Sequence, residues 1–224
     1  TISGAILVLY ATTLSKTVPN AVGHMIVASL ISLPAAVLIA RLMVPGDGSM
    51  SAEDADADLK YESSMDAVIK GTMEGMQLVL AVIAIIIVVF ALVNLTDQLL
   101  VLLPYVDAQP LTLKRIFGWL FAPLMWSIGI PWDQAPTAGA LMGTKTILNE
   151  YVAYLDLAAL PADTFDARSK LIITYALCGV ANLASVGLLV STIATLAPTR
   201  RAEVSALGMK SWVAGNMASA MTGA

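Results

Sequence analysis

Charged residues and metal-binding side chains are scarce in this sequence. Asp, Glu, Lys and Arg make up 12% of its 224 residues, roughly half of their share in a typical soluble domain. The single cysteine, Cys178, and the single histidine, His24, exclude a disulfide framework or a zinc site built from this chain alone. The net charge of −4 argues against a nucleic-acid partner, because nucleic acids bind to basic surfaces.

Recognisable motifs of catalysis are also missing. The sequence contains no H-E-x-x-H, no G-x-S-x-G and no phosphate-binding P-loop pattern. An enzyme acting within a membrane would need a Ser/His pair, an Asp/Asp pair or a metal motif. We therefore expect neither enzymatic activity nor a bound organic cofactor.

Apolar residues dominate what is present. They make up 58% of the chain, and the mean hydropathy is +0.82. Residues 171–197 contain no charged side chain, and residues 78–93 form an equally apolar run. The first stretch by itself, and the second with its flanking residues 76–103, reach the roughly 20 residues that a membrane-crossing helix needs. A lone strand cannot satisfy its backbone in lipid. The sequence therefore predicts an all-α, multi-pass protein of the lipid bilayer.

The apolar runs and their polar interruptions divide the chain into seven segments. We expect the end of a broken helix (1–14), a membrane or interfacial segment with an acidic linker (21–62), a long transmembrane helix (63–110), an interfacial segment (111–132), a re-entrant hairpin (133–160), a second broken transmembrane helix (165–198) and a last transmembrane helix (201–224). Because the chain opens inside an apolar run without a Met, we also expect further residues upstream of Thr1.

The stretch 143–154, G-T-K-T-I-L-N-E-Y-V-A-Y, places Lys145, Asn149 and Glu150 in an otherwise apolar region. An ionisable side chain costs at least ~2.5–3.5 kcal/mol at the centre of a bilayer, so it is retained there only where it is paired or functional. Two interpretations are open: a ligand-binding hairpin tip, or a solvated loop between two helices. The short apolar arms on either side favour a re-entrant hairpin that lines a cavity.

A second polar interruption lies within the apolar run 171–197. Asn182 and Ser185 are three residues apart, hence on one helix face, and Gly179 and Gly187 flank them. Such a pair marks either a broken helix that binds a ligand or polar contacts between packed helices. A similar break at residues 1–4 indicates an inverted repeat. In that architecture the substrate of a secondary transporter lies between the repeats, near the bilayer midplane.

Five stretches of the chain closely resemble the C-terminal part of the concentrative nucleoside transporter family, and they occur in the family's order. They are H-M-I-V-A-S-L-I-S-L-P-A-A (24–36), F-G-W-L-F-A-P-L (117–124), G-T-K-T-I-L-N-E-Y-V-A-Y (143–154), T-Y-A-L-C-G-V-A-N-L-A-S-V-G (174–187) and A-P-T-R-R-A-E-V-S-A-L-G-M-K (197–210).

The resemblance implies an ion-coupled importer of nucleosides such as uridine. Its members are homotrimers with one pocket per protomer, built from two re-entrant hairpins and two broken helices, and Na⁺ or H⁺ is the coupling ion. The first hairpin of the family is not found in this sequence. The alternative is a structural or regulatory membrane subunit that kept the fold and lost transport. The bacterial inner membrane is the expected location.

The resemblance also assigns the polar residues to the substrate. Glu150, next to Asn149 at the hairpin tip, would accept hydrogen bonds from the ribose hydroxyls, and Asn182 and Ser185 would complete the ribose site. Leaving a buried carboxylate without its partners is costly, so such a site is expected to penalise deoxy analogues.

Four further positions are assigned by the same resemblance. Ile6 would pack against the nucleobase. Val180 occupies a position at which the family has an aromatic residue, a departure expected to alter base selectivity or affinity. Thr1 and Ile2 would bind Na⁺, one through its hydroxyl and one through its carbonyl oxygen, the ligand type that a hard cation prefers.

Overall fold

The computed structural model describes residues 4–46, 62–106, 109–196 and 198–224. Within these ranges the regular structure is helical, apart from an isolated bridge between Val106 and Gln109. The expectation of a helical protein is therefore confirmed for the described residues. The predicted sodium ligands Thr1 and Ile2, and most of the acidic linker (47–61), lie outside them.

The helices succeed one another with short connections, apart from the two longer segments on either side of α3. In chain order they are α1 (Gly4–Leu14), α2 (Ala21–Met43), α3 (Ser64–Leu100), α4 (Leu113–Ser127), α5 (Ala135–Ile147), α6 (Glu150–Ala159), α7 (Ala167–Leu177), α8 (Leu183–Leu196), the 3₁₀ turn η2 (Pro198–Arg200) and α9 (Arg201–Gly223).

Polar side chains define where several of these helices begin. Ser63, Thr112, Asn149 and Asp166 each precede a helix in extended backbone, and each accepts a hydrogen bond from the backbone N–H three residues later. Such N-caps satisfy one of the donors that a helix start leaves without a partner. The starts of α3, α4, α6 and α7 are thus encoded locally.

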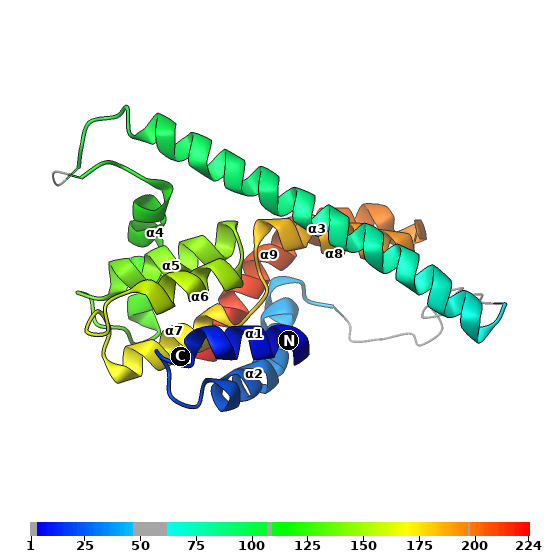
Figure 1. Ribbon diagram of the computed structural model, residues 1–224, viewed down its shortest axis with the longest axis horizontal. Helices are drawn as coiled ribbons and strands as arrows, with labels where there is room; N and C mark the ends of the chain where they lie inside the picture. The colour runs from blue at the N-terminus through cyan, green and yellow to red at the C-terminus, as the bar shows by residue number, and fades with distance from the viewer. Residues whose placement is uncertain (1–3, 47–61, 107–108, 197) are drawn as a thin grey trace.

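Helix α3 forms a long rod along one side of a more compact body (Figure 1), and it packs against α8 and α4. The body places α5 against both α4 and α6, and α9 against α2, α7 and α8. Its largest fully buried side chains include Tyr154, Met25, Leu141 and Ile173. The core therefore lies where α2, α5, α6 and α7 meet.

Helices α4 and α5 approach one another at glycine. A Cβ atom added to Gly139 would lie 2.5 Å from the carbonyl oxygen of Gly118, and one added to Gly118 would lie 2.9 Å from the carbonyl oxygen of Pro136. Small residues allow this close packing of membrane helices, for which apolar burial alone gives little driving force. The α4–α5 pair is consequently a rigid support for the turn between α5 and α6.

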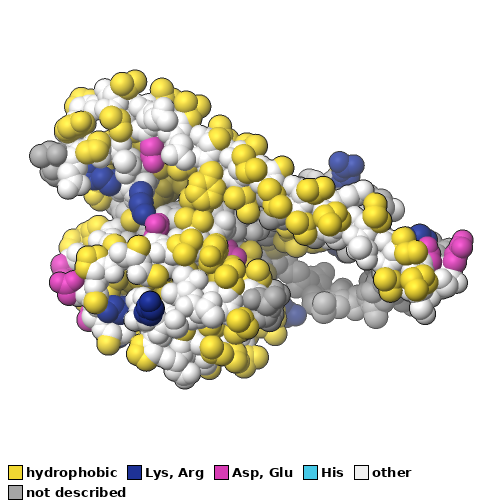
Figure 2. Space-filling view, viewed as in Figure 1, with side chains coloured by type: hydrophobic (Ala, Val, Ile, Leu, Met, Phe, Trp, Pro, Cys, Tyr) yellow, Lys and Arg dark blue, Asp and Glu magenta, His cyan; other side chains and the backbone are white. Residues whose placement is uncertain are grey.

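Apolar side chains cover much of the outer surface, including α3 (Figure 2). On α2 and α3, Leu30, Leu33, Leu80 and Ile87 are all more than half exposed. By length and composition, α2 is the one helix among the described residues that could cross a membrane by itself, and the apolar stretch Ile86–Leu100 of α3 is shorter. Such a surface is suited to lipid or to another protein rather than to water.

Candidate binding site

The hairpin turns at Leu148 and Asn149, between α5 and α6. This lies within the predicted stretch 143–154, of which Gly143, Thr144 and Lys145 belong to α5. Asn149 is extended, and its side-chain oxygen accepts from the N–H of Val152 at 2.9 Å. The cap makes Glu150 the first residue of α6, where the helix dipole favours a carboxylate.

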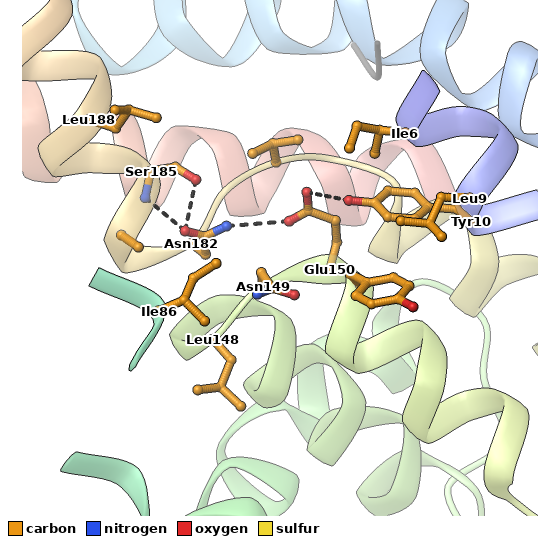
Figure 3. A pocket seen from close by; sticks show the side chains of 13 residues that line it. Ile6, Leu9, Tyr10, Ile86, Leu148, Asn149, Glu150, Asn182, Ser185 and Leu188 are labelled. Atoms are coloured by element: carbon orange, nitrogen blue, oxygen red, sulfur yellow. Dashed lines mark hydrogen bonds between the residues drawn. The ribbon is translucent and has the colours of Figure 1, made fainter. Parts of the chain in front are cut away.

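Glu150 connects three parts of the chain. Its side chain is buried, with the residue 6% exposed. Oε1 accepts from the hydroxyl of Tyr10 in α1 at 2.8 Å, and Oε2 accepts from Nδ2 of Asn182 at 3.3 Å (Figure 3). A carboxylate offers about four lone-pair sites, and each oxygen of Glu150 has one donor. Glu150 can therefore accept further hydrogen bonds.

Asn182 lies in the break between α7 and α8 and continues this hydrogen-bonded chain. Its Oδ1 accepts from the backbone N–H of Ser185 at 2.8 Å and from Oγ of Ser185 at 2.7 Å. The prediction that the two residues share one helix face is wrong, because Asn182 precedes α8 and caps it. The cap aims the amide nitrogen at Glu150.

A cavity of about 340 Å³ opens beside this chain of polar groups, within the range typical of small-molecule sites. Figure 3 shows the polar side chains of Ser185, Asn182, Glu150 and Tyr10 in a row, with Leu188 and Ile6 on one side of it and Ile86 and Leu148 on the other. The lining comprises Ile6, Leu9, Tyr10, Ile86, Leu148, Asn149, Glu150, Tyr151, Val180, Asn182, Ala184, Ser185 and Leu188.

The six residues that the sequence analysis assigned to the substrate all line this one cavity. Ile6 is 39% exposed and Val180 is 48% exposed, so both present apolar surface to the open space. Three side chains, Glu150, Asn182 and Ser185, form the polar wall. A site that combines a row of polar groups with an otherwise apolar lining suits an amphipathic ligand of small size.

The alternative of a solvated loop around 143–154 is wrong. Lys145 is 0% exposed and Glu150 is nearly as buried. Lys145 Nζ donates to the backbone oxygen of Ala176 at 3.1 Å. The polar residues of this stretch are therefore paired inside the protein, as ionisable groups in membrane segments usually are.

Tyr10 is the site residue that the sequence analysis missed. It is buried, and its ring lies 6.0 Å from that of Tyr151 and 5.1 Å from that of Tyr154. Its position four residues after Ile6 could have indicated it, because residues i and i+4 share a helix face. In an apolar helix, however, a lone Tyr is equally well explained as a packing residue.

A transition-metal site is not formed by the residues that the structure describes, since they contain no group of three or more His, Cys, Asp or Glu side chains placed to hold an ion. Carbonyl and hydroxyl oxygens, the ligands of the expected sodium site, are a different donor set. Their candidates, Thr1 and Ile2, are not among the described residues.

Comparison with known proteins gives concordant matches over the length of the chain. The family model for the Na⁺ dependent nucleoside transporter C-terminus matches residues 24–224. A nucleoside permease, NupC, of Helicobacter pylori is 32% identical over 207 residues, which cover 89% of this chain and 49% of that protein. Mouse solute carrier family 28 member 3 is 28% identical over 222 residues, covering 89% and 31%.

Solved structures also match this chain. A double variant of CNTnw in an outward-facing state has a TM-score of 0.81 at 34% identity, covering 100% of this chain and 53% of that chain. CNTnw in an inward-facing substrate-bound state has a TM-score of 0.77 at 34% identity, with the same coverage. The chain thus spans about half the length of the bacterial relative and of these structures. It belongs to the concentrative nucleoside transporter family, and it corresponds to the C-terminal region of that family.

Proposed function

We propose that this protein is a secondary active transporter that imports nucleosides by alternating access, driven by a gradient of Na⁺ or H⁺. The observation that supports it most directly is Glu150: a buried carboxylate, held by Tyr10 and Asn182, at the edge of a cavity of about 340 Å³. The family assignment supplies the substrate class. No bond of the substrate is broken during transport, so a polar wall that only donates and accepts hydrogen bonds is sufficient for this function.

The ribose is proposed to bind at the polar wall. Tyr10 and Asn182 each donate to one oxygen of Glu150, and the remaining lone pairs are available to two neighbouring hydroxyl groups of the sugar. An analogue that lacks one hydroxyl leaves a buried acceptor without its donor, at a cost of ~1–3 kcal/mol or more for a charged group. The site should therefore prefer ribonucleosides to deoxynucleosides.

The nucleobase is proposed to lie against the apolar wall formed by Ile6, Val180 and Leu188. These aliphatic side chains contact a flat base through dispersion, and they offer no donor or acceptor to distinguish one base from another. Base preference would then come from residues outside the described part of the pocket.

The finer features of the family are part of the same proposal. The α5–α6 hairpin would be re-entrant, with its tip at Leu148 and Asn149. Thr1 and Ile2 would provide the sodium ligands. The protein would assemble as a homotrimer in a bacterial inner membrane. The family model's own description as Na⁺ dependent favours Na⁺ over H⁺ as the coupling ion.

The test is uptake of radiolabelled uridine by vesicles that contain the full-length protein, with and without an inward Na⁺ gradient. Saturable uptake that the Na⁺ gradient stimulates, and that Glu150→Gln abolishes, is the expected result. Uptake driven only by a pH gradient would contradict the sodium site at Thr1 and Ile2 while leaving the pocket intact. Absence of uptake for every nucleoside tested would contradict the proposed transport itself.

A further inference from the structure

Lys145 is a fully buried cation that the proposed substrate site does not use. It lies in the last turn of α5, is 0% exposed, and its Nζ donates to the backbone oxygen of Ala176 at 3.1 Å. Removing an ammonium group from water is expensive unless the protein compensates it. The negative charge of Glu150 and the hydrogen-bond acceptors around Nζ are the groups that compensate it.

The carboxyl end of α7 provides such an environment. The last four carbonyl groups of a helix have no partner within it. In α7, the oxygen of Thr174 accepts from the hydroxyl of Tyr154 at 2.9 Å, that of Tyr175 from the N–H of Cys178 at 3.1 Å, and that of Ala176 from Lys145. Two of these three donors are side chains of the α5–α6 hairpin. A cation here also lies at the negative end of the helix dipole.

The end of the α7–α8 break that precedes α8 is connected by hydrogen bonds to the same turn of α5. Thr146, the next residue after Lys145, shares its one hydroxyl proton between the backbone oxygen of Met142 at 2.7 Å and Oδ1 of Asn216 at 3.1 Å. Asn216 in α9 donates from Nδ2 to the backbone oxygen of Ala181 at 3.0 Å. Ala181 directly precedes Asn182. Adjacent residues of α5 therefore reach both edges of the break, one directly and one through α9.

The charges of the hairpin match the two half-helices that meet at the break. Lys145 contacts the negative, carboxyl end of α7, and Glu150 accepts from Asn182, the residue that caps the positive, amino end of α8. The cation and the anion lie on either side of the hairpin turn. Each therefore complements the end of the half-helix that has the opposite partial charge.

We propose that Lys145 is a positioning residue: by capping the carboxyl end of α7, it holds the α7–α8 break in the geometry at which Asn182 meets Glu150. The consequence for nucleoside affinity rests on the proposed function, whereas the consequence for the break does not. The two can therefore be measured separately.

The experiment compares Lys145→Met and Lys145→Arg in the full-length protein in detergent. Met keeps the length of the side chain and removes both the charge and the donor, while Arg keeps both. Lys170→Met is the matched control, because Lys170 also donates from Nζ to a backbone oxygen, that of Ala162 at 2.6 Å, but at a partly exposed position outside the break.

Two quantities are measured for each variant. The first is the dissociation constant of uridine by calorimetry. The second is the rate of hydrogen–deuterium exchange at the backbone amides of residues 178–182, read by mass spectrometry of the peptide that contains them. These residues lie between α7 and α8, so their deuterium labelling without ligand reports how firmly the break is closed.

Lys145→Met should weaken uridine binding about tenfold, the expected effect of leaving a buried acceptor without its donor, and should speed the exchange of the amides of residues 178–182. Lys145→Arg should restore most of the uridine affinity and most of the slow labelling of the parent protein. Lys170→Met should change neither quantity. Unchanged labelling in Lys145→Met would overturn the proposal, whatever happens to affinity. Faster labelling in a protein that binds no nucleoside would support the cap and overturn the proposed function.

If Lys145→Met does not fold, Tyr154→Phe replaces it. This change removes only the hydroxyl that donates to the oxygen of Thr174, the neighbouring part of the same cap. It should also speed the exchange of the amides of residues 178–182 and weaken uridine binding, by less than the loss of the cation. Parent-like labelling and affinity in Tyr154→Phe would then count against the cap.

Discussion

At the scale of single residues, the site depends on two oxygen atoms of one carboxylate. Glu150 has one donor from α1 and one from the α7–α8 break, so its orientation is set by residues far apart in the chain. Hydrogen bonds to a charged group contribute more than those between neutral groups. The two donors consequently set the position of the carboxylate at the cavity.

Tyr10→Phe should weaken uridine binding about tenfold or more, because it removes a hydrogen bond to a charged acceptor while the ring keeps its contacts with Tyr151 and Tyr154. Calorimetry or the KM of uptake measures the change. The control is Tyr105→Phe, since Tyr105 is exposed and away from the cavity. Parent-like affinity in Tyr10→Phe would show that this donor does not position Glu150.

Val180→Phe should tighten nucleoside binding severalfold. Val180 is about half exposed on the cavity, and a ring there can stack on the base, an interaction of roughly 0.5–1.5 kcal/mol. The measurement is the dissociation constant for uridine, with Val180→Leu as the control for added apolar volume without a ring. Weaker binding by the Phe variant would indicate that the base does not approach this wall.

At the scale of secondary-structure elements, close packing determines where the hairpin tip lies. The α5 helix rests on α4 through Gly118 and Gly139, whose backbones are almost in contact. The tip at Leu148 and Asn149 extends from the far end of that helix. A shift of α5 relative to α4 would therefore move Glu150 away from Asn182.

Gly139→Ala should destabilise the protein, because a Cβ atom there would meet backbone atoms of Gly118 and Ala122 that cannot move aside. Overpacking of this kind typically costs ~1–3 kcal/mol, measurable as a lower thermal unfolding temperature in detergent. The control, Gly71→Ala in α3, adds a Cβ with nothing within 4 Å and should be neutral or slightly stabilising. Equal unfolding temperatures for the two variants would contradict the close α4–α5 contact.

At the scale of the whole molecule, the long helix α3 is the element that the body covers least (Figure 1). Ile86 faces the cavity, whereas Ile87, the next residue, is 63% exposed. The proposed homotrimer or the surrounding lipid would cover this outer face. Both surroundings are apolar, so both predict that a charge is not tolerated there.

Ile87→Lys should lower the amount of protein inserted in the membrane, since a charge at mid-bilayer costs at least ~2.5–3.5 kcal/mol. The measurement is the yield in the membrane fraction, together with the molar mass of the purified protein in detergent. Ile87→Leu is the control. A parent-like yield and mass for the Lys variant would indicate that this face of α3 is exposed to water.

Local signals in the sequence were sufficient for the helical class, for the family, and for six of the residues that line the cavity. Periods of apolar residues encode membrane helices, and polar residues in such helices are rare enough to mark where the chain is interrupted. These signals did not show where within residues 143–154 the chain turns, because Gly143 and Thr144 are compatible with a loop as well as with a helix. In the structure Gly143 instead lets Phe117 of α4 approach the α5 backbone.

The sequence by itself therefore determined which residues are candidates for the site. This is possible because the free-energy cost of a polar group in an apolar chain depends on that residue and its neighbours in the sequence. Only the tertiary structure decided how they meet. Tyr10 and Glu150 are 140 residues apart, and Lys145 and Ala176 are 31 apart. The direction of each hydrogen bond depends on the packing of α1, α5 and α7, and no local pattern of residues encodes that packing.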